Sequence, residues 1–548
     1  MSSANRALRI LLGVLTLLLL AEPGYVPLFD PDEGRYAEIG REILATGDWL
    51  IPRFNGVPFL EKPPLQPWIS AISLGIFGLE PFAARMPSKL AALVTLLAVF
   101  FFTRPRFGEK AALLSCTVLS ASLFFFAFAR INTLDSVLSC ALVCSALAFA
   151  AFQDHEAKGD RNRAQRSLYL LHLACGAGIL AKGLVGLILP GGAILLFVAL
   201  TGRYRVLPRL FSPGPLLVFL AVAIPWHVLV ALEEPAFLRY YVWNEQFARF
   251  FTNKHNRGEP FWFFLPIVAA GLLPFTFLAP ALREVWPRTR KERAERGVET
   301  YLFCYAAFVL LFFSASTAKL VPYVGSLFPP AAILLGVGLS RREIGRERLL
   351  TGGFVVLLGA AVLTVAFTLS DVRDLGVVPH AVVAGIVLVL TGIAVLMARK
   401  NPLMVLGTGW AVFLATLLVT LPIIARQVTP HTFNEALVSR LRPGDEVLHL
   451  GSFYRTIPFH ARRLTAAAAI GPVNELRFDA MSAHPSPLLI TEAEFKRRWN
   501  GPGRVFAVVH FDRVPDFGSP ASGLVRGTVI IQSPNERFTL IANPPAAR

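Results

Sequence analysis

The sequence predicts a mainly α-helical, polytopic membrane protein that ends in a small α/β domain. Hydrophobic residues occupy 54% of the 548 positions and charged residues only 16%, a balance outside the range of soluble globular domains. Apolar runs of about 17 to 25 residues, each long enough to cross a bilayer, recur as far as about Ala425. Beyond that residue the chain has the composition of a soluble domain.

The lengths of the apolar runs predict about thirteen membrane spans. The first run, Leu8 to Leu20, follows two arginines as a signal peptide would, but Ala-Glu-Pro-Gly at 21–24 is a poor cleavage site. This run is therefore interpreted as an uncleaved span. The predicted spans are 7–28, 82–103, 111–128, 133–153, 168–181, 183–200, 212–231, 261–282, 300–316, 320–340, 349–369, 377–397 and 402–425.

Clusters of Lys and Arg occupy every second connection between these spans, as the positive-inside rule requires. The rule assigns these connections and the N-terminus to the cytoplasm, and the two long connections, 29–81 and 232–260, to the outer side. We therefore expect a membrane domain at 1–427 and an outer soluble domain at 428–548. The basic clusters are Arg6/Arg9, Arg104/Arg106/Lys110, Lys158/Arg161/Arg163/Arg166, Arg203/Arg205/Arg209, Arg283 to Arg296, Arg341 to Arg348 and Arg399/Lys400.

Short alternating or apolar runs after the last span indicate strands, and two stretches have helical character. This mixture predicts the α/β fold of the tail. The strands are expected at Glu446–Leu450, Val505–Phe511, Thr528–Ile531 and Phe538–Ile541, and the helices near Phe433–Leu441 and Glu492–Trp499.

The formal net charge of +17 does not indicate a nucleic-acid partner. A nucleic-acid surface would gather Lys and Arg among aromatic residues in a soluble domain, whereas here the positive charge lies between hydrophobic runs. The five cysteines lie within or beside apolar segments and form no CxxC pair, so we interpret them as small membrane-embedded residues.

The first outer loop opens with a group of acidic residues, Asp30, Asp32 and Glu33. Apolar positions from Tyr36 to Leu44 follow helical spacing, which predicts an amphipathic helix on the membrane surface. Carboxylates beside a membrane surface require an explanation, and one explanation is a functional role. The alternative is that Asp30, Asp32 or Glu33 caps the N-terminus of the helix.

The same loop carries a charged pair, Glu61 and Lys62, between bulky apolar residues and prolines that stiffen the backbone. A rigid charged pair beside a membrane favours a binding role. The alternative is a salt bridge, within the pair or between Lys62 and an aspartate, that only fixes the loop.

Further charged residues lie at the outer ends of predicted spans or in outer loops. Arg130 and Asp135 flank the start of one span, where ionisable residues are functional candidates. Arg249 lies in the second long outer loop, after Glu245, and Lys319 lies in a short outer connection. Each of these is weak evidence by itself.

The motifs spread along the chain match a known family pattern. They are Asp32–Glu33 with Arg35–Ile39, Glu61–Pro63, Asn132–Asp135, Ala181–Gly183, Glu245 with Arg249–Phe250, Ala318–Tyr323, and Phe495, Trp499 and Phe506–Val509 in the tail. Together they resemble the membrane glycosyltransferases of the GT-C class, in the protein mannosyltransferase-like branch that includes the lipid A 4-amino-4-deoxy-L-arabinose transferases. One position departs from the pattern, because Gln246 stands where histidine is frequent, and this weakens the case for a metal site with a His ligand.

The resemblance implies a GT-C fold in a bacterial inner membrane, a sugar donor on undecaprenyl phosphate, and a lipid A phosphate as acceptor on the periplasmic side. Breaking the bond between sugar and oxygen leaves charge on the donor phosphate, and fixed cations stabilise such charge. Lys62 and Arg249 are the first candidates for this role, and Arg130 and Lys319 are the next.

The resemblance also implies roles for the acidic residues. A phosphate monoester has its second pKa near about 6, so the acceptor hardly needs a base. Asp32 would then orient the acceptor, remove a residual proton or hold a divalent cation, with Glu61 as a further ligand of that metal. Glu33 and Asp135 are further catalytic candidates. We expect a single displacement with inversion, since the sequence offers no identified covalent nucleophile.

Two alternatives remain open from the sequence. Transfer of a hexose or hexosamine to a glycan or protein hydroxyl would use the same class motifs. A transporter with an outer sensor domain would also be polytopic, but transporters often contain a structural repeat, and no paired half is visible in this sequence.

Overall fold

The chain forms two compact units in a computed structural model that describes residues 3–22, 24–248, 258–429, 431–469, 476, 481–482, 486–533 and 538–543. Unit 1 comprises Met1–Pro23, Pro87–Val228 and Tyr241–Leu421. Unit 2 comprises Gly24–Met86, Leu229–Tyr240 and Pro422–Arg548. Unit 2 thus combines the first long loop with the segment after the last span, whereas the predicted boundary at 427/428 separates them.

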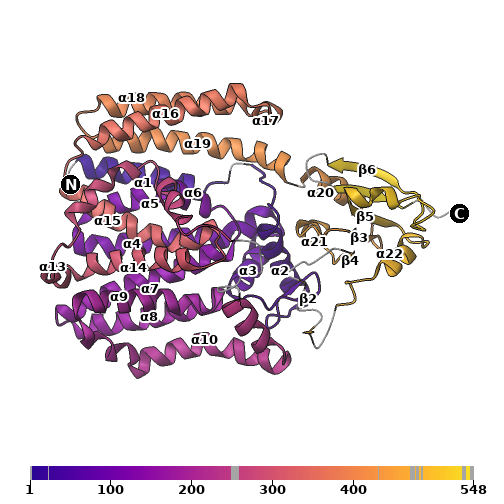
Figure 1. Cartoon of the computed structure of the whole chain (residues 1–548), viewed down its shortest axis with the longest axis horizontal. Helices are drawn as coiled ribbons and strands as arrows, with labels where there is room; N and C mark the ends of the chain where they lie inside the picture. The colour runs from indigo at the N-terminus through magenta and orange to yellow at the C-terminus, as the bar shows by residue number, and fades with distance from the viewer. Residues whose placement is uncertain are drawn as a thin grey trace. The chain divides into compact units, whose positions relative to one another are not determined.

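Eight helices among the described residues are long and apolar enough to cross a membrane. The count becomes nine if the bent pair α12 (Phe264–Gly271) and η4 (Thr276–Glu284) forms one span. The prediction of a mainly helical, polytopic membrane protein is therefore confirmed (Figure 1). The eight are α4 (Pro81–Phe107), α7 (Leu134–Ala157), α10 (Pro213–Glu233), α14 (Gly297–Ala315), η5 (Val321–Leu327) with α15 (Phe328–Arg341), α16 (Glu347–Thr368), α18 (Val378–Met397) and α19 (Pro402–Val428).

The other predicted spans also coincide with helices, but these are shorter, less apolar or interrupted. The run at 111–128 is divided at Ser122, whose ψ of 133° is extended, and the run at 261–282 bends by 89° between α12 and η4. Apart from α12 and η4, the helices that correspond to these predicted spans are α1 (Ser3–Leu20), α5 (Glu109–Ala121), α6 (Leu123–Phe128), α8 (Arg161–Lys182) and α9 (Val185–Thr201). Short helices complete unit 1: η1 (Tyr204–Val206), η2 (Pro208–Phe211), η3 (Arg239–Ala248, which begins in unit 2), α13 (Arg290–Glu295) and α17 (Ser370–Asp374).

Small residues allow neighbouring helices of unit 1 to pack closely. A Cβ on Gly359 of α16 would lie 2.8 Å from the carbonyl oxygen of Gly385 in α18, and one on Gly352 would lie 2.9 Å from that of Gly392. Figure 1 shows these two helices side by side. Van der Waals packing of small residues is a main source of helix association in lipid, where the hydrophobic effect does not drive helices together.

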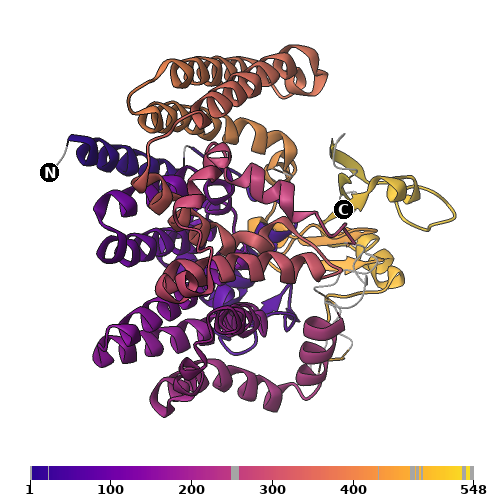
Figure 2. The same ribbon diagram turned by 60° about the vertical axis from the view of Figure 1, so that its left-hand side comes forward.

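Aromatic side chains fill the space between α7, α9 and α14. Phe149 of α7 lies 4.6 Å from Tyr301 of α14 and 5.9 Å from Phe197 of α9, measured between ring centroids. In both ribbon views the purple helices α7, α8 and α9 lie side by side (Figures 1 and 2). This core fixes α7, the helix that carries Asp135.

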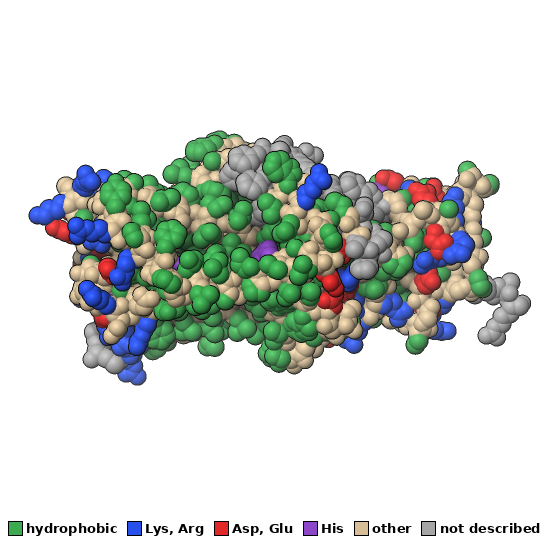
Figure 3. Space-filling model, turned by 90° about the horizontal axis from the view of Figure 1, so that it is seen from below, with side chains coloured by type: hydrophobic (Ala, Val, Ile, Leu, Met, Phe, Trp, Pro, Cys, Tyr) green, Lys and Arg blue, Asp and Glu red, His purple; other side chains and the backbone are tan. Residues whose placement is uncertain are grey.

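The basic connections of unit 1 are linked to one another by polar contacts. Arg106 pairs with Asp154 at 3.1 Å, Arg203 donates to the Ala294 carbonyl at 2.5 Å, and Lys110 donates to the Ser340 carbonyl at 3.4 Å. Lys and Arg side chains gather at the same end of these helices in the space-filling view, and hydrophobic side chains cover their flanks (Figure 3). The loops that the charge pattern assigns to the cytoplasm thus share one end of the helical unit.

The first long loop contributes α2 (Asp32–Thr46), α3 (Leu65–Phe77) and the strand pair β1 (Arg53–Phe54) and β2 (Val57–Pro58) to unit 2. The expected helix is present, but it is buried on several sides, unlike the amphipathic surface helix that the sequence predicts. Every residue from Glu33 to Ile43 except Arg35 is buried. The helix is covered on several sides because α3, β1 and α21 (Thr456–Ala461) all pack against it.

The segment after α19 forms a five-stranded mixed sheet with the order β4-β3-β5-β7-β6. β4, β3 and β5 are parallel, and β7 is antiparallel to both β5 and β6. The four expected strands are present at nearly the expected bounds, and β4 is an additional one. The strands are β3 (Glu446–Leu450), β4 (Ala466–Ala468), β5 (Val505–His510), β6 (Thr528–Ser533) and β7 (Phe538–Ala542).

Helices cover both faces of this sheet, because successive side chains of β3 and β5 point to opposite faces and nearly all of them are buried. Phe495 and Trp499 of α22 (Glu492–Trp499) pack on one face with residues such as Leu448. Phe433 and Leu437 of α20 (His431–Val438) pack on the other, together with α21. A short helix, η7 (Phe511–Asp516), follows β5.

His449 in β3 makes the stability of this sheet sensitive to acid. The side chain is fully buried, and neither ring nitrogen has a hydrogen-bond partner among the described residues. Burial lowers the pKa of His449 to about 3 from its usual 6.5. The unfolded state therefore binds the proton more tightly, and stability is lost as the pH falls below 6.5.

We predict that acidification from about pH 7 to about pH 5 destabilises the sheet by about 2 kcal/mol through this residue. His449→Phe, which retains a ring against Phe453, should remove most of that loss. Hydrogen exchange of β3 and β5 in the full chain at the two pH values measures it. An unchanged pH dependence in the variant would contradict the prediction.

Candidate functional site

The two acidic residues at the start of α2 have opposite environments. Consecutive side chains on an α-helix point about 100° apart, so Asp32 and Glu33 cannot share a face. The Asp32 side chain is 52% exposed and pairs with Arg35, whereas the Glu33 side chain is 1% exposed. The residue at the N-cap position is Pro31, whose side chain makes no capping hydrogen bond.

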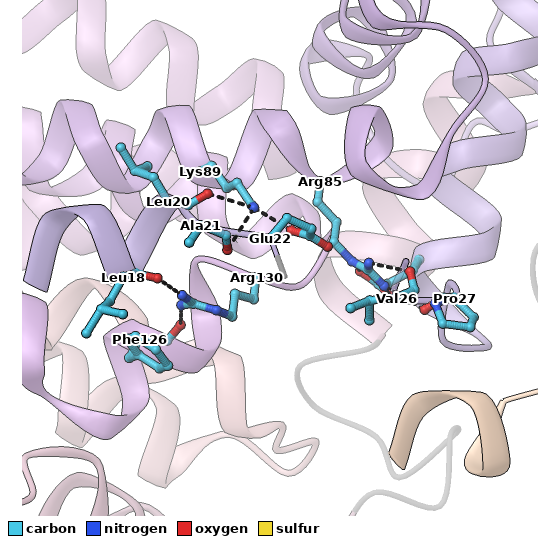
Figure 4. A network of polar contacts seen from close by, with 11 residues as sticks. Leu18, Leu20, Ala21, Glu22, Val26, Pro27, Arg85, Lys89, Phe126 and Arg130 are labelled. Atoms are coloured by element: carbon cyan, nitrogen blue, oxygen red, sulfur yellow. Dashed lines mark hydrogen bonds and ion pairs between the residues drawn. The ribbon is translucent and has the colours of Figure 1, made fainter. Parts of the chain in front are cut away.

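Glu33 is held by a buried ion pair with Arg85 of α4. Arg85 donates through Nε and Nη2 to the two carboxylate oxygens of Glu33, at 2.8 and 2.6 Å. The guanidinium also donates to the carbonyls of Val26 and Pro27, both at 2.7 Å, as Figure 4 shows for the labelled residues. The backbone NH of Phe29 donates to Glu33 as well, at 2.9 Å. This bonding fixes the direction of the first turn of α2.

Two further buried cations lie in unit 1, where Figure 4 shows their partners. Lys89, one turn after Arg85 in α4, pairs with Glu22 and donates to the Leu20 carbonyl at 3.0 Å. Arg130 donates to the Phe126 carbonyl at 2.7 Å and to that of Leu18, and its guanidinium lies 3.6 Å from the Phe126 ring centroid. Backbone carbonyls thus occupy donors of Arg130, and its role as a phosphate ligand stays a prediction.

Glu61 and Lys62 are both buried in unit 2, at 6% and 7% exposure. The Lys62 ammonium donates to the backbone carbonyl of Glu61 at 2.8 Å. Phe59, three residues before Lys62, packs edge-on against Tyr36 of α2 with ring centroids 6.3 Å apart. The loop that carries the charged pair therefore contacts the helix that carries Asp32.

Asp135 lies at the N-terminal end of α7 in unit 1, where Thr133 caps the helix by accepting from the Asp135 NH. Its carboxylate forms an ion pair with Lys182 at the end of α8. The Lys182 ammonium also lies 4.3 Å from the centroid of the Tyr323 ring, a cation–π arrangement. Three segments distant in sequence thus meet around the Lys182 ammonium.

Lys319 is buried in unit 1 and donates to the carbonyls of Ser316 and Glu259, at 2.6 and 2.8 Å. Glu245 lies in η3, which ends at Ala248. Arg249 lies outside the described residues, and so does the side chain of Gln246. The predicted roles of Lys319 and Arg249 at a phosphate stay predictions.

The predicted site residues divide into two groups. Asp32, Glu33, Glu61 and Lys62 belong to unit 2, and Arg130, Asp135 and Lys319 belong to unit 1. That the two groups meet around one substrate stays a prediction from the sequence.

The described residues do not supply a ready metal site. Among them, no group of three or more His, Cys, Asp and Glu side chains is arranged to hold an ion. The cation predicted between Asp32 and Glu61 stays a prediction.

Sequence reasoning missed a buried charge network within α2. Arg41 donates to Glu38 at 2.5 and 2.7 Å, and Glu42 accepts from the NH groups of Asn55 and Gly56. Burial raises the pKa of Glu38 well above its usual value and raises that of Glu42 as well. The spacing of Glu38 and Arg41, three residues apart on a helix, was an available signal.

Sequence reasoning also assigned no role to three ion-paired cations, Arg85, Lys89 and Lys182. Arg85 and Lys89 stand inside the apolar run predicted at 82–103, and Lys182 lies between two spans. An ionisable residue within a span requires a partner, and that rule identifies Arg85 and Lys89. It does not identify the partners, which come from distant segments.

Three comparisons with known proteins show which proteins the chain is similar to. Residues 61–229 match the family model described as dolichyl-phosphate-mannose-protein mannosyltransferase. The undecaprenyl phosphate-alpha-4-amino-4-deoxy-L-arabinose arabinosyl transferase of Edwardsiella ictaluri is 34% identical over 348 residues, 62% of this chain and 61% of that protein. The protein of the same name from Aeromonas salmonicida is 33% identical over 381 residues, 68% of each chain. This chain thus spans about three fifths of the Edwardsiella protein.

The crystal structure of ArnT from Cupriavidus metallidurans bound to undecaprenyl phosphate is similar over 98% of both chains, with a TM-score of 0.84 and 25% identity. Fold and motifs together define a polytopic membrane glycosyltransferase of the GT-C class. Within that class, the chain belongs to the family of undecaprenyl phosphate-alpha-4-amino-4-deoxy-L-arabinose arabinosyl transferases.

Removal of Arg85 should destabilise the protein strongly, because it leaves Glu33 buried without a counter-ion. We predict a loss of about 3 to 5 kcal/mol for Arg85→Met. The matched control Arg35→Met removes the partner of the exposed Asp32 and should cost less than about 1 kcal/mol. Thermal unfolding of the purified full chain in detergent compares the two, and equal midpoints would refute the assignment.

Proposed function

We propose that the chain transfers 4-amino-4-deoxy-L-arabinose, or a related aminosugar, from undecaprenyl phosphate to a phosphate of lipid A on the periplasmic side of the inner membrane. The observation that carries this proposal is the exposed carboxylate of Asp32, held by the buried Glu33–Arg85 pair, in a chain with the fold of ArnT. The similar ArnT structure from Cupriavidus metallidurans is bound to undecaprenyl phosphate, which supports a polyprenyl phosphate donor here.

The reaction is one displacement at the anomeric carbon of the sugar. The bond between that carbon and the donor phosphate oxygen breaks, and its electron pair stays on undecaprenyl phosphate. An oxygen of the lipid A phosphate forms the new bond from the opposite face, so the configuration inverts. The acceptor phosphate is largely ionised at neutral pH and already nucleophilic, so the protein has mainly to position it and to stabilise the leaving phosphate.

Asp32 is the acidic group available for positioning the acceptor. Its side chain is half exposed, whereas the buried carboxylate of Glu33 is bonded to Arg85 and to the backbone NH of Phe29. We therefore assign Asp32 as the catalytic carboxylate and Glu33 as a positioning residue. Residual protonation of the acceptor would be removed by the same Asp32 carboxylate.

Lys62 and Arg249 are assigned to the leaving phosphate. Lys62 is buried, and a cation away from water stabilises developing negative charge more strongly than an exposed one. Arg249 offers a planar fork that binds phosphate with two hydrogen bonds. Arg130 and Lys319 are further candidates, and Asp135 with Lys182 forms a second charged group for the sugar or the acceptor.

We further propose thirteen spans, a cytoplasmic N-terminus and a periplasmic domain at 428–548. This topology is supported by the coincidence of every predicted apolar run with a helix and by the shared end of the basic loops. An odd number of spans then puts the five-stranded sheet on the periplasmic side.

Transfer of a hexose to a hydroxyl is the second candidate function. The mannosyltransferase family model at residues 61–229 favours it. A hydroxyl acceptor needs deprotonation, so Asp32 would then act as a general base. Mass spectrometry of lipid A from cells with and without the intact gene separates the two, because only the first adds an aminopentose to lipid A.

We predict that Asp32→Asn, Lys62→Ala and Arg249→Ala each lower sugar transfer by at least about 100-fold, as the loss of one preorganised charged group does in other enzymes. Transfer is measured with purified full-length protein, a polyprenyl phosphate aminosugar and lipid A. The variants should elute from a sizing column as the wild type does.

Glu343→Gln provides the control, because this exposed glutamate lies between α15 and α16 among the basic connections. It should keep wild-type transfer. Wild-type rates in the Asp32, Lys62 and Arg249 variants would eliminate the assigned site.

A further inference from the structure

The start of α2, which carries Asp32, is bonded to the C-terminal segment of the chain. Asp30 accepts hydrogen bonds from the NH of Arg455 at 3.3 Å, the NH of Thr456 at 3.4 Å and the hydroxyl of Thr456 at 3.2 Å. Thr456 is fully buried and begins α21. Asp30 is partly buried, and the desolvation of its carboxyl raises the pKa of Asp30 to about 6, above its usual 3.8. Asp30 is two residues from Asp32 in sequence.

The two segments approach so closely that α2 needs a glycine at the contact. A Cβ on Gly34 would lie 2.6 Å from Cγ2 of Thr456 and 2.8 Å from its backbone nitrogen. Apolar packing extends the contact, because Phe459 of α21 belongs to a buried cluster that includes Ala37 of α2. The first two turns of α2 therefore lie directly against the C-terminal segment.

The other end of α2 is bonded to the same segment through the turn between β1 and β2. Glu42 accepts from the backbone NH groups of Asn55 and Gly56. The Asn55 amide then donates to the carbonyl of Thr465 at 2.7 Å and accepts from its NH at 2.9 Å. Asn55 is fully buried and has a positive φ of 51°, so this turn is specifically shaped.

The C-terminal segment thus holds α2 at both ends, through Asp30 with Thr456 and through Asn55 with Thr465. We propose that this segment is a working part of the transferase: Asp30 and Thr456 are positioning residues that set where the Asp32 carboxylate lies during sugar transfer. The inference rests on the proposed function of Asp32. The physical reason is geometric, since a misplacement of about 1 Å at a reacting group lowers a rate by about 100-fold.

The test measures kcat and KM of the full chain for the lipid donor. Asp30→Ala should lower kcat by about 10- to 100-fold and leave KM within about twofold, because positioning acts on the reacting geometry rather than on donor binding. Asp30→Asn keeps one accepting oxygen and should retain kcat within about threefold of the wild type. Thr456→Val removes the hydroxyl donor and should change kcat in the same direction as Asp30→Ala.

The two positions should also be coupled. Asp30→Ala combined with Thr456→Val should cost less than the product of the two single effects, because the second change removes a bond that the first has already broken. A loss of kcat in the double variant that equals the product of the two single losses would contradict the proposal, because the two residues would then act independently.

Asn543→Ala provides the matched control for a merely structural effect. This buried asparagine donates to the carbonyls of Gly503 and Trp499 and accepts from the NH of Val505, all within the C-terminal segment. It should lower the unfolding midpoint and leave kcat unchanged at temperatures below that midpoint. A wild-type kcat in Asp30→Ala, or an equal loss in Asn543→Ala, would overturn the proposal. Such a result alongside an inactive Asp32→Asn would leave the function of Asp32 intact, which separates the two claims.

Discussion

Burial of the Glu33–Arg85 ion pair is the constraint on which the candidate site depends. A carboxylate in an apolar surrounding is strongly unfavourable unless a cation and further hydrogen bonds accompany it. Arg85 supplies the cation, and its guanidinium also donates hydrogen bonds to the carbonyls of Val26 and Pro27. Because the helix rotates by about 100° per residue, fixing Glu33 inward leaves Asp32 at the surface. One buried pair thus assigns different roles to two neighbouring acids.

The need for a polar partner away from water also applies to other cations of the chain. Lys89 is paired with Glu22 and Lys182 with Asp135, while Lys319 is surrounded by backbone carbonyls. Carbonyls satisfy a cation without neutralising it, so a cation held in this way retains its charge for an anionic ligand. This difference suits Lys319 to the role at a lipid phosphate that is proposed for it. An ion-paired cation such as Arg85 is suited to fixing the fold.

Local sequence patterns predicted the helices well, but they could not predict contacts between residues that are distant in sequence. Each apolar run became a helix, but the division at Ser122 and the bend between α12 and η4 depend on tertiary packing that periodicity does not record. β4 consists of three alanines, which carry little strand propensity and are buried by pairing with β3. The acidic start of α2 was visible as a candidate site. Its separation into one paired and one exposed acid was not, since Arg85 lies 52 residues from Glu33 in sequence.

The most direct test is a cryo-EM structure of the full chain in a lipid nanodisc with a non-transferable phosphonate analogue of the lipid-linked aminosugar. The account predicts that the phosphonate lies within hydrogen-bond distance of Lys62 and that the Asp32 carboxylate faces the anomeric carbon, with Glu33 still bonded to Arg85. An analogue bound elsewhere, or one that contacts Glu33 while Asp32 points into solvent, would contradict the account.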